Sequence, residues 1–144
     1  MIRLLYLSTF CATHGVVKQI LVDILEVSKK NNLALGITGV LVNAGGMFLQ
    51  ILEGPEQQVL RKYVEILDDK RHTDCRIVLI TTIEERAFPN WAMGLLNIPA
   101  HEFHEVQAIL NRRHETDDAK CFREVLELFM KPGPRQPEPS KRNQ

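Results

Sequence analysis

The sequence has little of what marks nucleic-acid-binding, membrane or secreted proteins. Its 18 Lys and Arg residues are balanced by 18 Asp and Glu residues, so the formal net charge is zero. A nucleic-acid or anionic-membrane partner would require clustered basic residues, and the balance therefore predicts neither. No apolar run approaches the roughly 18 residues needed to span a bilayer. The apolar start of the chain ends at Ser8 with no small-residue cleavage site after it, so it predicts a strand rather than a signal peptide.

Cysteine is scarce, and the common metal and nucleotide motifs are absent. The three cysteines, Cys11, Cys75 and Cys121, lie far apart and form no Cys-x-x-Cys pair. This pattern disfavours a disulfide framework or a zinc site and is typical of free thiols in a reducing cytoplasm. The histidines show no metal-ligand spacing, and neither a nucleotide-binding glycine loop nor a nucleophile elbow occurs. We therefore predict a cytoplasmic protein without a metal site.

What the 144 residues do contain is an alternation of strand and helix patterns within the length of one domain. Apolar residues recur at helical spacing in two segments, and short apolar runs bounded by turn residues predict strands. The predicted strands are 2–9, 37–43, 47–53, 75–83 and 90–98, and the predicted helices are 16–30 and one opening at Pro55. The order β-α-β-β-α-β-β predicts an α+β, ferredoxin-like sandwich with a five-stranded mixed sheet.

The predicted strands are apolar on both sides. In the first strand, for example, Leu4 and Leu5 point to opposite faces. Two helices can cover only one face of such a sheet, so we predict that 101–111 and 117–130 form helices that cover the other. Residues 131–144 hold four of the seven prolines and almost no apolar residues, which predicts a disordered tail.

Several polar side chains occupy positions where the strand alternation predicts a buried apolar residue. Tyr6 and Ser8 lie on the same strand face as apolar neighbours, and Gln50 lies between Phe48 and Leu52. A buried Gln amide needs partners at both ends, and a buried Tyr hydroxyl usually finds one. A structural Tyr–Gln hydrogen bond is therefore one interpretation, and a functional pair is another.

Other candidates also have ordinary structural interpretations. Asn31 and Asn32 could end a helix, and the charged run 69–72 could be a solvated helix terminus. Trp91 and Met93 alternate along a predicted strand, where a core role is the default. Taken singly, these residues leave both interpretations open.

In their joint order, these segments resemble a BLUF domain, the family of blue-light receptors that use flavin adenine dinucleotide. The resemblance runs from about residue 1 to residue 97, and the remainder resembles the short, stand-alone members with two C-terminal helices. It implies a flavin-binding photosensory domain over 1–98, a helical extension over 99–130 and a tail over 131–144. The segments that carry it are Leu4-Leu5-Tyr6-Leu7-Ser8, Asn31-Asn32, Gly36-Ile37-Thr38-Gly39, Phe48-Leu49-Gln50, Leu52-Glu53-Gly54, Asp69-Lys70-Arg71-His72 and Trp91-Ala92-Met93-Gly94.

The resemblance implies a non-covalent FAD, for which FMN or riboflavin can substitute, between the two helices on one sheet face. Ile24 and Ile66 match the positions on either side of its ring, and Asn32, supported by Asn31, matches the contact to its pyrimidine edge. The positions around the ribityl chain and ring edge are matched by Asp69, Arg71 and His72.

The resemblance also implies a photoactive set. Tyr6 matches the family's electron donor, which passes an electron and a proton toward the flavin, and Gln50 matches the amide that switches its hydrogen bonds and shifts the absorption to the red. Trp91 and Met93 match the pair thought to carry the signal outward. Ser8, on the same strand as Tyr6, is assigned to the same photoactive set.

We therefore predict a blue-light receptor that catalyses no reaction itself. The resemblance implies a homo-oligomer that acts on a separate effector protein, for example a cyclic-dinucleotide phosphodiesterase. Three alternatives remain: a small ferredoxin-like enzyme such as an acyl-phosphate hydrolase using Arg71 and an Asn, a flavin-dependent reductase, and a BLUF-like fold that serves only as an interaction module. The first lacks a glycine-rich anion loop beside an Arg, the second lacks a nicotinamide motif, and intact Tyr6 and Gln50 disfavour the third.

Overall fold

The structure is a computed structural model of the chain, and it describes residues 1–10 and 17–129. The predicted tail, 131–144, and Cys11 lie outside the described residues. The strands are β1 (Ile2–Phe10), β2 (Thr38–Ala44), β3 (Met47–Gly54), β4 (His72–Thr82) and β5 (Gly94–Asn97). The helices are α1 (Val17–Leu35), α2 (Glu56–Leu67), α3 (Ala100–Asn111) and α4 (Asp118–Phe129), with a short 3-10 turn over Arg113–Glu115.

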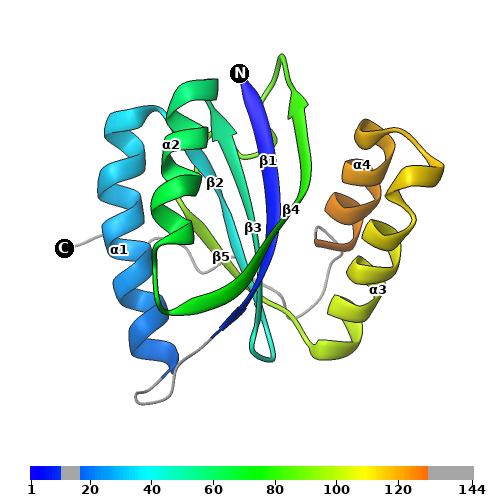
Figure 1. Cartoon of the computed structure of the whole chain (residues 1–144), viewed down its shortest axis with the longest axis horizontal. Coiled ribbons are helices and arrows are strands. Elements are labelled where there is room, and N and C mark those ends of the chain that lie inside the picture. The colour runs from blue at the N-terminus through cyan, green and yellow to red at the C-terminus, as the bar shows by residue number, and fades with distance from the viewer. Residues whose placement is uncertain (11–16, 130–144) are drawn as a thin grey trace.

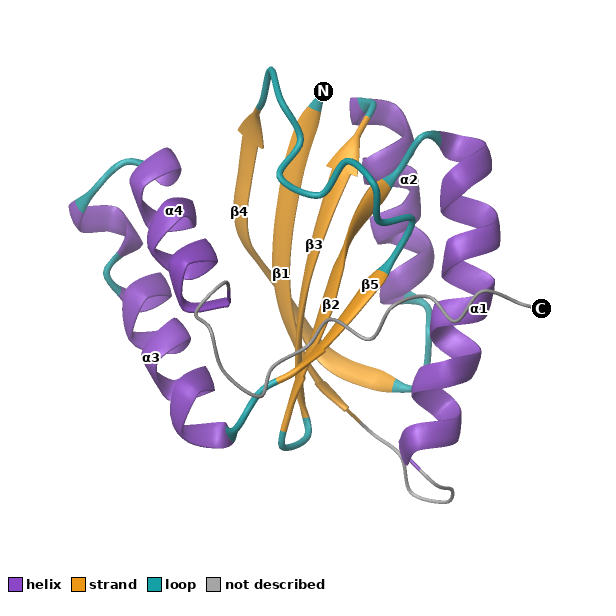
Figure 2. Cartoon of the chain, turned by 180° about the vertical axis from the view of Figure 1, so that it is seen from behind, coloured by secondary structure: helices purple, strands orange, loops and turns teal. Residues whose placement is uncertain are grey.

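The five strands form one mixed sheet in the order β4-β1-β3-β2-β5. β1 pairs antiparallel with both β3 and β4, and β2 pairs antiparallel with β3, whereas β5 lies parallel to β2. The predicted ferredoxin-like sandwich with one extra strand is therefore confirmed. Because β4 and β5 are at opposite edges, the segment between them, 83–93, must cross the sheet, and Figure 2 shows it doing so.

Helices cover both faces of the sheet, as the two-sided apolar strands predict (Figure 1). On one face, α1 and α2 pack over Leu4, Tyr6 and Leu52. On the other, α3 and α4 supply Phe103, Phe122 and neighbouring apolar side chains to a core that includes Leu5 and Leu49. We call these the pocket face and the output face. Among the described residues, no helix has the length and apolar character to cross a membrane.

The first helix runs further than the sequence predicts. Asn31 and Asn32 do not end it, because α1 continues to Leu35. Gly36 adopts a left-handed φ of 69°, its N–H donates to Leu33 O (3.3 Å), and the N–H of Ile37 donates to Asn32 O (2.9 Å). This is the Schellman pattern, in which a glycine without Cβ strain closes the helix. The extension places the Asn32 side chain within the helix rather than at its end.

The last two strands also differ from the prediction. β4 begins at His72, is an edge strand, and is exposed along much of its length, although the sequence pattern predicts apolar packing on both sides. β5 covers only Gly94–Asn97, so Trp91 and Met93 precede the strand instead of alternating along it. Before β5 the chain turns at Pro89 and Asn90, and the Trp91 N–H donates back to Phe88 O at 3.4 Å rather than to a neighbouring strand.

Candidate functional site

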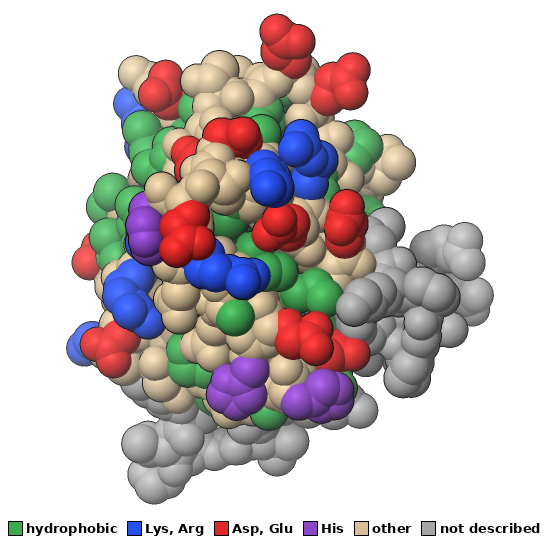
Figure 3. Space-filling view, turned by 90° about the vertical axis from the view of Figure 1, so that its right-hand side faces the viewer, with side chains coloured by type: hydrophobic (Ala, Val, Ile, Leu, Met, Phe, Trp, Pro, Cys, Tyr) green, Lys and Arg blue, Asp and Glu red, His purple; other side chains and the backbone are tan. Residues whose placement is uncertain are grey.

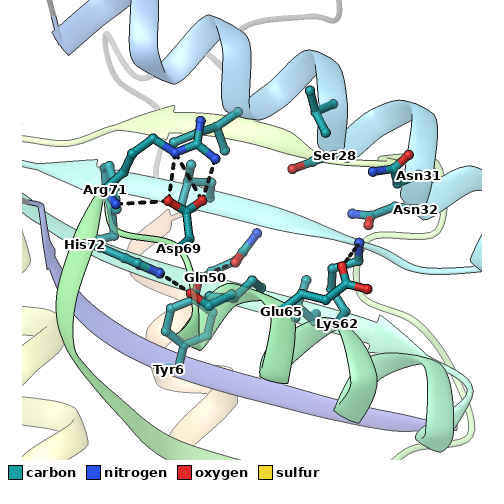
Figure 4. Close-up of a pocket in the computed structure, with 16 residues that line it drawn as sticks. Tyr6, Ser28, Asn31, Asn32, Gln50, Lys62, Glu65, Asp69, Arg71 and His72 are labelled. Carbon is teal, nitrogen blue, oxygen red and sulfur yellow. Dashed lines mark hydrogen bonds and ion pairs between the residues drawn. The ribbon is translucent and has the colours of Figure 1, made fainter. Parts of the chain in front are cut away.

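A cavity opens on the pocket face between α1 and α2 (Figure 4). Its volume is about 210 Å³, below the ~300 Å³ at which pockets for drug-sized ligands usually begin. The cavity is open to solvent on one side, and its floor is formed by strands of the sheet. Its lining consists of Tyr6, Ile24, Val27, Ser28, Asn31, Asn32, Leu41, Phe48, Gln50, Leu52, Lys62, Glu65, Ile66, Asp69, Arg71 and His72.

At the floor of the cavity, a hydrogen-bonded pair joins β1 and β3. Their register sets Tyr6 directly opposite Gln50, and the Tyr6 hydroxyl donates to Gln50 Oε1. The other end of the amide is also occupied, since Gln50 Nε2 donates to Met93 Sδ at 3.3 Å. All three side chains are buried. Because thioether sulfur is a weak acceptor, the amide is held firmly at its oxygen end and loosely at its nitrogen end.

The surroundings of Tyr6 keep its phenol neutral. Burial is the main cause that raises the pKa of Tyr6 well above 10.0, and the nearby Cys75, Tyr63 and Asp69 add to it. The ring lies among other aromatic groups, with its centroid 5.2 Å from Tyr63 and 6.2 Å from His72. The phenol therefore remains a hydrogen-bond donor throughout the physiological pH range.

Asn32 offers an unsatisfied acceptor to the cavity. Its side chain is buried, and Nδ2 donates to Ala92 O at 3.0 Å. Its Oδ1 has no hydrogen-bond partner among residues 1–10 and 17–129, a deficit that costs about 1–3 kcal/mol for a buried polar atom. Asn31 also lines the cavity but is exposed. A ligand that brings an N–H or O–H donor to Asn32 Oδ1 would satisfy it.

Charged residues after α2 border the cavity. The Asp69 carboxylate accepts hydrogen bonds from the Arg71 backbone N–H (2.9 Å) and from the Arg71 guanidinium. The side-chain hydrogen bond from Arg71 is the main cause that lowers the pKa of Asp69. The guanidinium of Arg71 is therefore held beside the Asp69 carboxylate at the border of the cavity.

His72 joins three elements beside Tyr6. Its Nε2 lies 2.6 Å from Ile66 O at the end of α2, and its Nδ1 lies 3.0 Å from Ser8 Oγ on β1. A carbonyl oxygen can only accept, so we assign the proton to Nε2, which lets Nδ1 accept from the Ser8 hydroxyl. Both ring nitrogens are thus satisfied, and the ring is held in a single orientation.

Most, but not all, of the predicted site residues meet at the cavity. Ser8 and Met93 each lie one contact away, through His72 and Gln50. Trp91 lies outside the cavity and packs against the output-face core, with its ring centroid 5.5 Å from that of Phe88. The indole lies over Gly94, and a Cβ added to Gly94 would come within 2.1 Å of it. In this structure Met93, and not Trp91, contacts Gln50.

The sequence motifs do not include several lining residues, among them Ser28, Lys62 and Glu65. Helical spacing could have found them, because Ser28 is four residues after Ile24 and Lys62 is four residues before Ile66. Lys62 Nζ bonds Glu65 Oε2 at 3.0 Å, and its side chain is only 13% exposed. A cation is therefore available at this edge of the cavity.

The lining fits a flavin. Flat apolar faces require apolar walls, which Ile24 and Ile66 can provide, and the polar edge of the ring carries both donors and acceptors. The orphaned Asn32 Oδ1 is a buried acceptor for such a donor. No group of His, Cys, Asp and Glu able to hold a metal ion occurs in the described ranges 1–10 and 17–129.

Comparison with known proteins gives a consistent result. A family model, "BLUF: Sensors of blue-light using FAD", matches residues 1–94. The chain is 39% identical to a photoactivated adenylate cyclase subunit beta of Euglena longa over 71 residues, 49% of this chain and 8% of that one. It is 32% identical to the blue light- and temperature-regulated antirepressor BluF of Escherichia coli (strain K12) over 91 residues, 62% of this chain and 23% of that one. The matched region thus spans a small part of these curated relatives.

Solved structures extend the similarity to the helices of the output face. "BlsA photo-activated state" has a TM-score of 0.73 and 25% identity, covering 91% of this chain and 96% of that chain. "BlrB - a BLUF protein, dark state structure" has a TM-score of 0.68 and 27% identity, covering 88% and 92%. A bacterial light-regulated adenylyl cyclase has a TM-score of 0.61 and 36% identity, covering 90% of this chain but 36% of its own.

Proposed function

This chain belongs to the BLUF family, the sensors of blue light using FAD, and from that premise we propose that it is a blue-light receptor whose photochemistry depends on Tyr6 and Gln50. The observation that carries the proposal is the buried hydrogen bond from the Tyr6 hydroxyl to Gln50 Oε1 at the floor of the cavity. A bound flavin supplies the absorption of blue light and an excited state able to oxidise a nearby phenol.

Tyr6 is suited to the role of donor. A buried phenol that lost only an electron would leave an unpaired charge in an apolar site, which is costly. Its hydroxyl proton already points at Gln50 Oε1, so the proton has an acceptor available when the electron leaves. Electron and proton can then leave together, without a buried charge on the tyrosine.

Gln50 is suited to the role of switch. An amide has an acceptor at one end and donors at the other, so rotation or tautomerisation exchanges what it presents at nearly constant volume. The weak contact from Nε2 to Met93 Sδ is the bond such a change would give up, and a thioether contact is easily lost. A hydrogen bond newly donated into the cavity would shift the absorption to the red.

We assign the remaining predicted residues to binding. Ile24 and Ile66 are the walls of the ring site, and Asn32, with Asn31 beside it, is the contact to the ring edge. Asp69, Arg71 and His72 border the ribityl side. The lining of the cavity supports these roles. FMN or riboflavin would bind through the same contacts.

The test is a visible spectrum of the dark-purified protein before and after a blue flash. We expect a flavin spectrum that moves slightly to the red and returns in darkness. A protein that binds flavin and bleaches without a red shift would contradict the Tyr6–Gln50 assignment, and a protein that cannot be reconstituted with flavin would contradict the receptor assignment as a whole.

We further propose that residues 1–98 sense light and 99–130 pass the signal to a separate effector, without catalysis by this chain. The similarity to BlsA and BlrB over nearly their whole chains supports this organisation. One similar structure, "Klebsiella pneumoniae BlrP1 with FMN and cyclic diGMP, no metal ions", includes a cyclic dinucleotide, and a cyclic-dinucleotide phosphodiesterase is therefore the effector to test first. We propose a homo-oligomer in the cytoplasm, where the thiols of Cys75 and Cys121 would remain reduced.

A further inference from the structure

Glu53 is a buried carboxylate that the light-sensing chemistry does not use. It lies on β3 facing the output face, and its side chain is fully buried. Its Oε1 accepts from the Phe88 N–H at 2.8 Å, and its Oε2 accepts from the Ala87 N–H at 3.0 Å. An ionised group so deeply buried is rare unless it is paired, and here Arg3 on the neighbouring β1 provides the opposite charge.

Arg3 extends the cluster to the C-terminal helices. Its Nε lies 2.9 Å and its Nη2 2.8 Å from Glu53 Oε2. The same guanidinium stacks over the ring of Phe122 on α4, 3.7 Å from the ring centroid. Such cation–π contacts strengthen when they are shielded from water, and Arg3 is only 11% exposed. Glu53 thus orients Arg3, and Arg3 contacts α4.

The segment 83–93 connects this cluster to the cavity. Five residues after Phe88, Met93 accepts the hydrogen bond of the Gln50 amide, and Asn32 binds the carbonyl oxygen of Ala92. In its middle, the segment is held by Glu53 on the output face through the Ala87 and Phe88 N–H groups. The segment therefore reaches the switching amide through the Met93 side chain and the partner of Arg3 through these two N–H groups, and Figure 2 shows it crossing the sheet between β4 and β5.

We propose that Glu53 is a positioning residue that makes the segment 83–93 and helix α4 respond together when Gln50 changes its hydrogen bonds. The proposal rests on the proposed function. Release of Met93 by Gln50 removes the hydrogen bond between the segment and the switching amide, while the hydrogen bonds to Ala92 O and Trp91 O keep this end attached to the sheet and to α1. A change at Gln50 therefore reaches the segment as a shift. Because the two N–H groups and Arg3 share one carboxylate, a shift of Ala87 and Phe88 alters the position of Arg3 and hence its stacking on Phe122.

The test compares hydrogen–deuterium exchange of the flavin-bound protein in darkness and under blue light. We expect the wild type to show a light-dependent change in the peptides of α4. In Glu53→Gln, which keeps an acceptor but loses the charge, we expect the red shift to remain and the change in α4 to fall by about fivefold or more, the scale of typical coupling between sites. Glu105→Gln, on the exposed side of α3, is the matched control and should behave like the wild type.

A second variant keeps the proposal testable if Glu53→Gln does not fold. Arg3→Lys preserves the charge opposite Glu53 but lacks the planar group that stacks on Phe122, and it should also reduce the response of α4 while Arg123→Lys does not. An undiminished α4 response in either Glu53→Gln or Arg3→Lys would overturn the proposal, as would a wild type that shifts to the red without any change in α4. Absence of a red shift in the wild type would instead contradict the proposed function.

Discussion

At the scale of single residues, the cavity depends on polar atoms that are only partly satisfied. Gln50 has a strong partner at its oxygen and a weak one at its nitrogen, and Asn32 Oδ1 has no partner in the part of the chain that the structure describes. Buried polar groups are normally bonded, so such exceptions mark places where a ligand or a rearrangement can supply the missing bond. Their chemistry can be tested one side chain at a time.

Replacement of Tyr6 or Gln50 should separate flavin binding from the light response. Tyr6→Phe removes the electron donor's hydroxyl, and Gln50→Leu removes the switching amide, while both keep the approximate side-chain volume. We expect each variant to bind flavin and to lose the red shift, as measured by visible difference spectra. A normal photocycle in either variant would show that the assigned mechanism is wrong.

Replacement of Asn32 should weaken flavin binding. Asn32→Ala removes the orphaned Oδ1 acceptor and the bond to Ala92 O. Loss of one hydrogen bond to the ligand, worth about 1 kcal/mol, predicts a rise in Kd of roughly fivefold, measured by flavin fluorescence titration. Asn43→Ala, which removes an amide paired with Asn97 outside the cavity, is the control and should leave the Kd unchanged.

The two tyrosines should resist ionisation in the folded protein. Burial raises the pKa of both Tyr6 and Tyr63 above 10.0, so near-ultraviolet absorption at that pH should show much less phenolate before unfolding than after it. Because the folded pKa values lie above the unfolded ones, the stabilisation is complete below pH 10 and is lost as the pH rises through the folded values. Tyr6→Phe should reduce this alkaline loss of stability, and an unchanged alkaline transition would contradict the assignment.

At the scale of elements, register and a short connecting segment determine which residues meet. The antiparallel pairing of β1 with β3 places Tyr6 opposite Gln50, and a slip by one residue would move both side chains to the other face. The segment 83–93 is equally constrained, because it must cross from one edge of the sheet to the other. It delivers Met93 to the pocket face and Trp91 to the output face.

Gly94 should control where Trp91 lies. A Cβ at this position would come within 2.1 Å of the indole, so Gly94→Ala must displace Trp91 from its present site. Trp91 is the only tryptophan of the chain, and its fluorescence therefore reports its own environment. We expect a shifted emission maximum and altered dark recovery. An emission spectrum identical to that of the wild type would refute the packing described here, and Trp91→Phe should abolish the signal.

At the scale of the whole molecule, one sheet contributes side chains to two hydrophobic cores. The pocket-face core and the output-face core share the same strands, and their side chains alternate along them. Figure 3 shows that the outer side of the α3 and α4 pair carries Lys and Arg side chains next to Asp and Glu side chains. A partner that docks there would meet charges of both signs, which favours a specific protein contact over nucleic acid.

The two cores should therefore unfold together. Phe103→Ala, in the buried face of α3, should lower the free energy of unfolding by about 3–5 kcal/mol. Because the strands are shared, we expect flavin release and loss of helical circular dichroism to shift to lower temperature by the same amount. A flavin-release temperature that stays at the wild-type value while helicity falls would show that the output-face helices unfold independently.

The sequence by itself determined the fold class and the two-sided sheet, because strand and helix periodicities are local properties of the chain. It also placed Tyr6 and Gln50 among apolar residues, whereas the roles of Asn32 and the other binding positions followed from the resemblance to the BLUF family. Only the tertiary structure decided which partners they have. Met93 rather than Trp91 contacts Gln50, and Gly36 rather than Asn32 ends α1. The alternation along β3 places Glu53 on the same face as Leu49 and Ile51, but its partners could not be predicted, because four donors on β1 and the segment 83–93 converge on it only when the sheet is assembled.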